Sequence, residues 1–202
     1  MSTAAQKVDY KRELKHLYTA ARKPALVDVP PLHYLMVRGS GGPYGARYGA
    51  AVEALFAVAY AVKFAVRREQ GVDFGVLPLE SLWHAKDGAV PQESWEWTAM
   101  IMQPPPVTAQ AVEAARAAVI AKKALPVAAE LTYEELVEAT SAQVLHVGPY
   151  DAEKPTIESL HAFITGRGLQ ACGAHHEIYL NNPERTEAER LKTIIRQPVR
   201  ER

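Results

Sequence analysis

The chain has 202 residues, with 23 Lys and Arg against 23 Asp and Glu, one Cys and 14 Pro. Hydrophobic residues make up 48% and charged residues 23%, as in ordinary soluble globular proteins. The length fits one large domain or two small ones. Because duplex nucleic acids are bound through a basic excess, a net charge of zero argues against nucleic acid as the main partner.

No membrane or targeting segment is predicted. The N-terminal sequence lacks the apolar run of a signal peptide. The most apolar stretch, residues 49–66, is interrupted by Glu53 and Lys63, which favours a buried amphipathic helix over a membrane span. The lone Cys172 cannot form an intramolecular disulfide. We therefore expect a cytoplasmic protein without a membrane partner.

Residues 1–30 form a predicted leader that packs on the domain. Six Lys and Arg stand there against three Asp and Glu. Apolar residues at helical spacing predict one short helix. They are Tyr10, Leu14, Leu17 and Tyr18. A basic arm that binds DNA is the alternative, which the three acids disfavour.

The pattern that follows predicts two strand–helix–strand–strand modules joined by a connecting segment. Module one, residues 31–107, has a strand over 32–39, a helix over about 46–68 and strands over 73–83 and 94–103. Module two, residues 140–199, has a strand over 141–148, a helix over 156–166 and strands over 173–180 and 191–199. The connecting segment, residues 108–139, begins with a helix over 108–123. Its remainder, 124–139, stays open between a capped helix start and a strand.

Short sequence echoes relate the two modules. Gly-Pro-Tyr occurs at 42–44 and again at 148–150, and a Gln-Pro pair closes the last strand of each module. We therefore expect one α+β domain over residues 31–199. It would contain two pseudo-twofold-related βαββ modules with a mainly antiparallel sheet, helices on one side and a ligand cleft between the modules.

Two acidic residues stand at corresponding places in predicted strands of the two modules, Glu80 and Glu177. An acid within an apolar strand is costly unless it is solvated, paired or used. Strand alternation places Glu177 on one face with His175 and Tyr179. Two readings remain open. Both acids lie on the solvent face of a half-exposed sheet, or they face one another across a ligand cleft.

Aromatic residues gather near both acids in the sequence and can clamp a planar ligand or a cation. The candidates for ligand binding are Tyr44, Trp83, Trp97, Tyr150 and Tyr179, and core packing is the alternative for the Trp residues.

Histidines raise the question of a metal site, and we expect none. His175 and Glu177 form a possible chelating pair, but His176 points to the opposite face and no zinc motif occurs. Motifs for an acyl-enzyme nucleophile or a phosphate-binding loop are also missing from the sequence.

The ordered motifs KVDYKRELKHLY, VDVPPLHYLMVRGSG, VLPLESLWH, QVLHVGPYDAE, HHEIYLNNPERT and LKTIIRQPV together resemble the free-standing GyrI-like small-molecule-binding proteins. The resemblance runs from about residue 6 to residue 199. The family more often has Gly where this chain has Ser81 and Ala139, and the Ser81 departure bears on the local backbone.

The resemblance implies a cleft in which the acid matching Glu177 contacts the ligand, often cationic and aromatic. The free-standing branch includes cyclopropanoid cyclopropyl hydrolases, which detoxify DNA-alkylating natural products and so confer drug resistance. This implies a cofactor-independent hydrolase with Glu177 as general base, assisted by Tyr179 or alternatively by Tyr150 or His175. Glu80, Trp83, Trp97, Tyr150, His175 and Tyr44 are the expected ligand-binding residues. The alternatives are a non-catalytic binder of aromatic or cationic drugs and a protein-interaction module.

Overall fold

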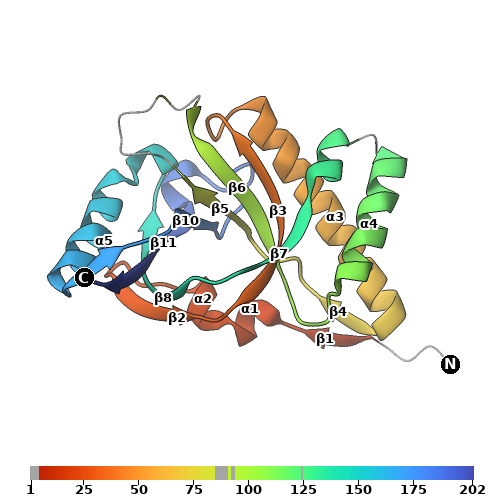
Figure 1. Ribbon diagram of the computed structural model, residues 1–202, viewed down its shortest axis with the longest axis horizontal. Coiled ribbons are helices and arrows are strands. Elements are labelled where there is room, and N and C mark those ends of the chain that lie inside the picture. The colour runs from red at the N-terminus through yellow and green to blue at the C-terminus, as the bar shows by residue number, and fades with distance from the viewer. Residues whose placement is uncertain (1–4, 85–90, 92–93, 124) are drawn as a thin grey trace. The chain divides into compact units, whose positions relative to one another are not determined.

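The structure is a computed structural model that describes residues 5–84, 91, 94–123 and 125–202 (Figure 1). Its residues form two units. Unit 1 comprises Met1–Glu13, Leu32–Leu77 and Ala85–Leu136. Unit 2 comprises Leu14–Pro31, Pro78–His84 and Val137–Arg202. Each unit is therefore assembled from segments that are distant in the sequence.

Unit 1 is built around one long strand. This strand, β3 (Leu32–Ser40), pairs antiparallel with β6 (Glu96–Gln103) on one edge and β7 (Thr132–Leu136) on the other. A separate parallel pair joins β1 (Gln6–Val8) to β4 (Val72–Phe74). The helical elements are α1 (Tyr10–Glu13), α3 (Ala46–Gln70), α4 (Ala109–Lys123) and the 3₁₀ helix η2 (Pro126–Glu130).

The long helix α3 covers β3 and β6 and lies beside α4, as the orange and green helices of Figure 1 show. It ends at Gly71, whose positive φ of 68° closes the helix in the left-handed conformation that glycine adopts without strain. One face is buried. The buried residues are Tyr48, Ala51, Ala54, Leu55, Val58, Ala59, Val62 and Val66.

By length and composition α3 is also apolar enough to cross a membrane, the one such helix in the described part of the chain. Core helices of soluble proteins pass the same test, and the packing of α3 on β3, β6 and α4 accounts for its apolar face. The helix is the buried amphipathic helix that the sequence predicts, although its opposite side keeps several large apolar residues.

Unit 2 contains an antiparallel sheet whose strands run in the order β2 (Ala25–Val29), β8 (Ala139–Val147), β11 (Lys192–Glu201), β10 (His175–Tyr179), β5 (Leu79–Trp83). The short strand β9 (Leu169–Ala171) pairs antiparallel with the end of β11. The helical elements are α2 (Lys15–Tyr18), η3 (Tyr150–Ala152), α5 (Lys154–Gly166) and η4 (Ala188–Arg190).

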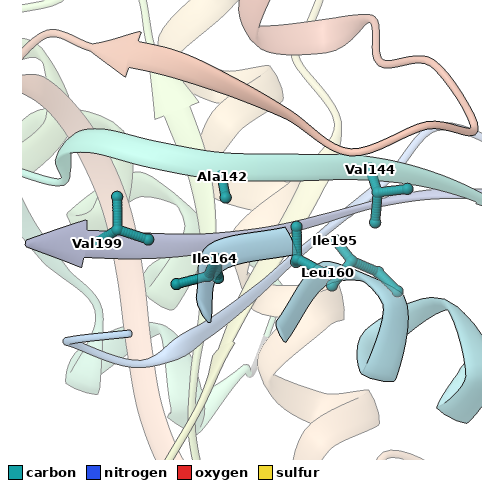
Figure 2. Packing of buried hydrophobic residues seen from close by; sticks show 6 residues of the cluster. All are labelled: Ala142, Val144, Leu160, Ile164, Ile195 and Val199. Carbon is teal, nitrogen blue, oxygen red and sulfur yellow. The ribbon is translucent and has the colours of Figure 1, made fainter. Parts of the chain in front are cut away.

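Helix α5 closes an apolar core against two strands of this sheet. Figure 2 shows its Leu160 and Ile164 packed with side chains from β8 and β11. The strand residues of the cluster are Ala142, Val144, Ile195 and Val199. Burial of such side chains contributes about 1.5–3 kcal/mol each. This core fixes α5 against β8 and β11.

The α+β class with mainly antiparallel strands is confirmed, and the differences from the predicted elements are local. The predicted strand over 73–83 is two strands, β4 and β5, because Pro78 lies between them and lacks a backbone donor. The predicted leader helix is two single turns, and the leader also supplies β1 and β2. The open segment after α4 contains η2 and the strand β7. Residues 1–4 and Ala124 lie outside the described residues.

Ala139 adopts a φ of 53°, the one positive value for a non-glycine residue in the described part of the chain. Left-handed backbone costs an L-residue about 1–2 kcal/mol, which glycine avoids. Replacing Ala139→Gly should therefore raise the free energy of unfolding by about 1 kcal/mol, measured by urea unfolding. The matched control is Ala171→Gly on β9. Ala171 has an ordinary backbone conformation, so this substitution should lower the free energy of unfolding. An equal decrease in the free energy of unfolding in both variants would contradict backbone strain at Ala139.

Candidate functional site

The two faces of strand β10 carry two different polar clusters. Pairing with β5 places His175 opposite Trp83 and Glu177 opposite Ser81. Because side chains alternate, His175, Glu177 and Tyr179 lie on one face and His176 and Ile178 on the other. The first face holds the candidate site, and the second is buried.

Glu177 is held by three neighbouring side chains. His175 Nε2 lies 3.1 Å from Glu177 Oε1, and the Tyr179 hydroxyl donates to Oε2 at 2.7 Å. The Trp83 indole N–H donates in turn to the Tyr179 hydroxyl at 3.2 Å. The Glu177 side chain keeps 14% of its surface exposed.

These contacts set the ionisation of Glu177. Burial alone would raise its pKa, but hydrogen bonds from His175, Tyr179 and Trp83 outweigh burial and hold the pKa below the ordinary carboxyl value. Glu177 is therefore a carboxylate at neutral pH, fixed in place by its donors.

A second carboxyl group lies beside it. Glu153 is buried at the start of α5, next to Glu177 and the Thr193 hydroxyl. Burial and the charge of Glu177 raise the pKa of Glu153 to about 9. Two adjacent carboxyl groups cannot both ionise cheaply, so they hold one proton between them. At neutral pH the proton is on Glu153 and the charge on Glu177, which is the arrangement of an acid and a base.

Aromatic rings border the carboxylate. The rings of Tyr150 and Tyr179 meet edge to face, with centroids 5.5 Å apart. Both tyrosines are partly exposed, whereas Trp83 is buried. Of the sequence-predicted residues, the structure brings together Glu177, Tyr179, His175, Trp83 and Tyr150.

The opposite face of β10 holds a buried network around His176. His176 Nε2 lies 3.0 Å from Glu80 Oε2, and His176 Nδ1 lies 3.0 Å from Glu138 Oε1. Arg196 lies 3.4 Å from Glu138, and the Tyr18 hydroxyl donates to Glu80 at 2.8 Å. Burial would lower the pKa of His176, but the Glu138 charge and hydrogen bonds to both acids raise it to about 9. The buried imidazole is therefore charged and stands between two carboxylates.

Glu80 thus does not face Glu177. The strand register puts the two carboxyl groups on opposite faces of neighbouring strands, and Glu80 is fully buried. Neither reading of the paired acids describes this position, because Glu80 is neither solvated nor directed toward Glu177. Its observed partners are His176 and Tyr18.

Trp97 and Tyr44 belong to unit 1. Trp97 is 1% exposed, meets Tyr48 edge to face and lies under Gly39, where an added Cβ would stand 2.5 Å from the indole. Tyr44 is highly exposed in the turn before α3. The ligand-binding roles of both residues stay predictions.

The remaining histidines have other surroundings. His146 contacts the Thr156 hydroxyl at 3.0 Å and the Pro149 carbonyl at 3.2 Å, which ties β8 to the start of α5. His161 lies on α5, where burial and the charge of His175 lower its pKa. Within residues 5–84, 91, 94–123 and 125–202, no three His, Cys, Asp or Glu side chains form a group that could hold a metal ion.

Sequence reasoning missed Glu153. It stands in the turn PYDAEKP, one residue before Lys154 begins α5, where acids are common because they complement the helix dipole. Nothing in the local pattern predicts its burial. The sequence echo of Gly-Pro-Tyr at 148–150 marks the right turn without indicating which residue in it is functional.

Comparisons with known proteins show the family to which the chain belongs. A model of the family described as "GyrI-like small molecule binding domain" matches residues 22–200. An uncharacterized conserved protein from Listeria innocua is 36% identical, with a TM-score of 0.88 over 96% of this chain and 100% of that one. Another Listeria innocua protein, described as a hydrolase, is 34% identical with the same TM-score and coverage. The C-terminal domain of EcmrR, 14% identical, has the same fold with a TM-score of 0.60 over 89% of this chain and 98% of that one. No curated protein sequence matches the chain.

The raised pKa of Glu153 predicts a stability change with pH. Between pH 4.5 and about 9 the unfolded chain ionises Glu153 while the folded protein keeps it protonated, so stability from this residue falls as pH rises. Glu153→Gln removes this dependence, and its melting temperature relative to the unsubstituted protein should rise by at least about 2–4 °C from pH 5 to pH 8.

Thermal unfolding at both pH values measures this difference. Glu158→Gln, which removes an exposed carboxyl group from α5, is the control. A parallel pH profile for Glu153→Gln and the unsubstituted protein would show that Glu153 ionises normally.

Proposed function

We propose that this chain, which belongs to the GyrI-like family of small-molecule-binding domains, is a hydrolase. It opens a reactive ring in hydrophobic aromatic molecules, such as the cyclopropane of DNA-alkylating natural products, and thereby detoxifies them. The observation that carries the proposal is the neighbouring pair of carboxyl groups, Glu153 and Glu177, of which only Glu177 is contacted by His175 and Tyr179.

Glu177 acts as the general base. Its carboxylate takes a proton from a water molecule as the water oxygen bonds to a ring carbon of the substrate. The hydrogen bonds of His175 and Tyr179 orient the carboxylate but also lower its basicity. These hydrogen bonds favour the reaction by holding the carboxylate in place, because less conformational entropy is then lost when the base and the water reach the reactive geometry.

Glu153 acts as the general acid. As the ring carbon–carbon bond breaks, its electron pair moves into the conjugated carbonyl of the substrate, whose oxygen gains negative charge. The protonated Glu153 supplies a proton to that oxygen, directly or through one water. Attack and bond cleavage then add one water to the substrate, with no oxidant and no cofactor.

The aromatic residues hold the substrate. Tyr150 and Tyr179 offer partly exposed ring surfaces next to the carboxylate, and Trp83 donates a hydrogen bond to the Tyr179 hydroxyl. A flat aromatic ligand stacked there places its reactive ring near Glu177. Two Listeria innocua relatives described as hydrolases, 35% and 34% identical, support the enzymatic reading.

A second candidate is a non-catalytic binder of cationic aromatic drugs. The charge of Glu177 beside two tyrosine rings favours it, since a cation gains from both the carboxylate and the ring faces. The two functions differ in whether the Glu153 proton is transferred.

Glu177→Gln should lower turnover by about 10²–10⁴-fold, because the amide cannot accept the water proton. Binding of the substrate should persist, since the amide has nearly the same shape. The assay incubates each protein with a panel of cyclopropane-bearing alkylators, and mass spectrometry measures the water-added product. Glu158→Gln is the control and should keep full activity. Absence of water-added product with the unsubstituted protein across the panel would contradict the hydrolase proposal.

Glu153 should set the alkaline limit of activity. Because its pKa is about 9, the rate should fall as pH rises through 9, where the acid loses its proton. Glu153→Gln should be slower by about 10²-fold at neutral pH and should lose this alkaline fall. Initial rates between pH 6 and pH 10 test this, and an unchanged alkaline fall in Glu153→Gln would assign the acid to another group.

A further inference from the structure

One side of α3 exposes a row of aromatic rings. Phe56, Tyr60 and Phe64 follow one another at intervals of four residues, which aligns them along the helix. Tyr60 is 49% and Phe64 54% exposed, and Phe56 is partly exposed. Adjacent ring centroids are 6.5 Å and 6.4 Å apart. Contiguous exposed aromatic surface of this kind marks an interaction site more often than isolated apolar residues do.

The charges at the ends of the row are opposite and symmetric about its centre. Glu53 precedes Tyr60 by seven residues and Arg67 follows it by seven, so all three lie near one side of the helix. Glu53 is exposed, and Arg67 keeps 53% of its side chain exposed while lying 4.0 Å from Asp73. Lys63, which lies over the Phe64 ring, is paired with Asp73 at 3.1 Å.

We propose that α3 is a dimerisation surface whose partner is α3 of a second copy of this chain, packed antiparallel about a twofold axis at Tyr60. Residues equally distant from Tyr60 then face each other across the interface. Phe56 meets Phe64 of the other copy, the two Tyr60 rings meet on the axis, and Glu53 meets Arg67. Such self-complementarity is what an isologous interface requires.

The charge pattern favours a second copy over other occupants. A lipid surface would select cations along the edge of the apolar row and gain nothing from Glu53. A copy of the same helix uses both Glu53 and Arg67, twice. The proposal is independent of the hydrolase proposal, because α3 belongs to unit 1 and carries none of the candidate catalytic residues.

Sedimentation velocity over a series of protein concentrations tests the proposal. We expect a monomer–dimer equilibrium with a Kd in the micromolar range, since one helix pair buries less than a standard interface of about 1,600 Å². Tyr60→Glu places two like charges on the axis and should raise the Kd at least about 100-fold. The control is Val137→Glu, at a highly exposed apolar position in unit 2, which should leave the Kd unchanged.

Charge exchange provides a sharper test of the antiparallel register. Glu53→Arg alone and Arg67→Glu alone should each raise the Kd about 5- to 10-fold, because each creates two like-charge contacts. The double variant restores both pairs with reversed signs and should return the Kd to near its original value. If both single variants weaken the dimer and the double variant does not return the Kd toward its original value, this register is refuted.

Two other results would overturn the proposal. One is a chain that stays monomeric at all concentrations, or a dimer that Tyr60→Glu does not affect. The other is a monomer that co-sediments with phosphatidylcholine–phosphatidylserine vesicles and loses that binding in Tyr60→Glu, which would make the row a membrane-contact surface. Circular dichroism of each variant confirms that α3 is intact.

Discussion

The buried contact of His176 with Glu80 and Glu138 is the interaction on which unit 2 depends. It joins β10 to β5 and to the segment before β8, while Arg196 and Tyr18 tie β11 and α2 to the same acids. Buried charges are tolerated only when each has its partners, so the network specifies one arrangement of these strands. Glu177 stands next in the chain on the other face of β10, and its position is a consequence of that arrangement.

The two faces of β10 have different surroundings, and this difference explains the chemistry of the site. The buried face compensates acidic side chains with a protonated imidazole and a guanidinium group. The other face brings two acids together with hydrogen bonds concentrated on one of them. The result is one carboxylate and one carboxylic acid side by side at the same pH. The rigid buried face allows this imbalance to persist, because the site cannot relax by moving the strand.

Much of the fold and part of the site could be predicted from sequence, for identifiable reasons. The spacing of residues along the chain, with a period of 3.6 in a helix and 2 in a strand, shows which residues share a face. It therefore predicts the buried stripe of α3 and the common face of His175, Glu177 and Tyr179. The position of Glu80 depends on strand register, which the alternation within one strand does not determine. Glu153 depends on how α5 docks on the sheet, a tertiary property that a turn sequence does not encode.

Unit 2 is assembled from three separate segments of the chain, which affects the order in which the site folds. Its central strand, β11, pairs with β8, β10 and β9 and follows all of them in the chain, while β2 and β5 come from the first half of the sequence. β2 therefore has to wait for its partner β8, which ends at residue 147, and β5 for its partner β10, which ends at residue 179. Such long-range pairing makes folding slow and exposes strand edges in the meantime. During synthesis, the face of β10 that carries Glu177 is among the last surfaces of the molecule to form.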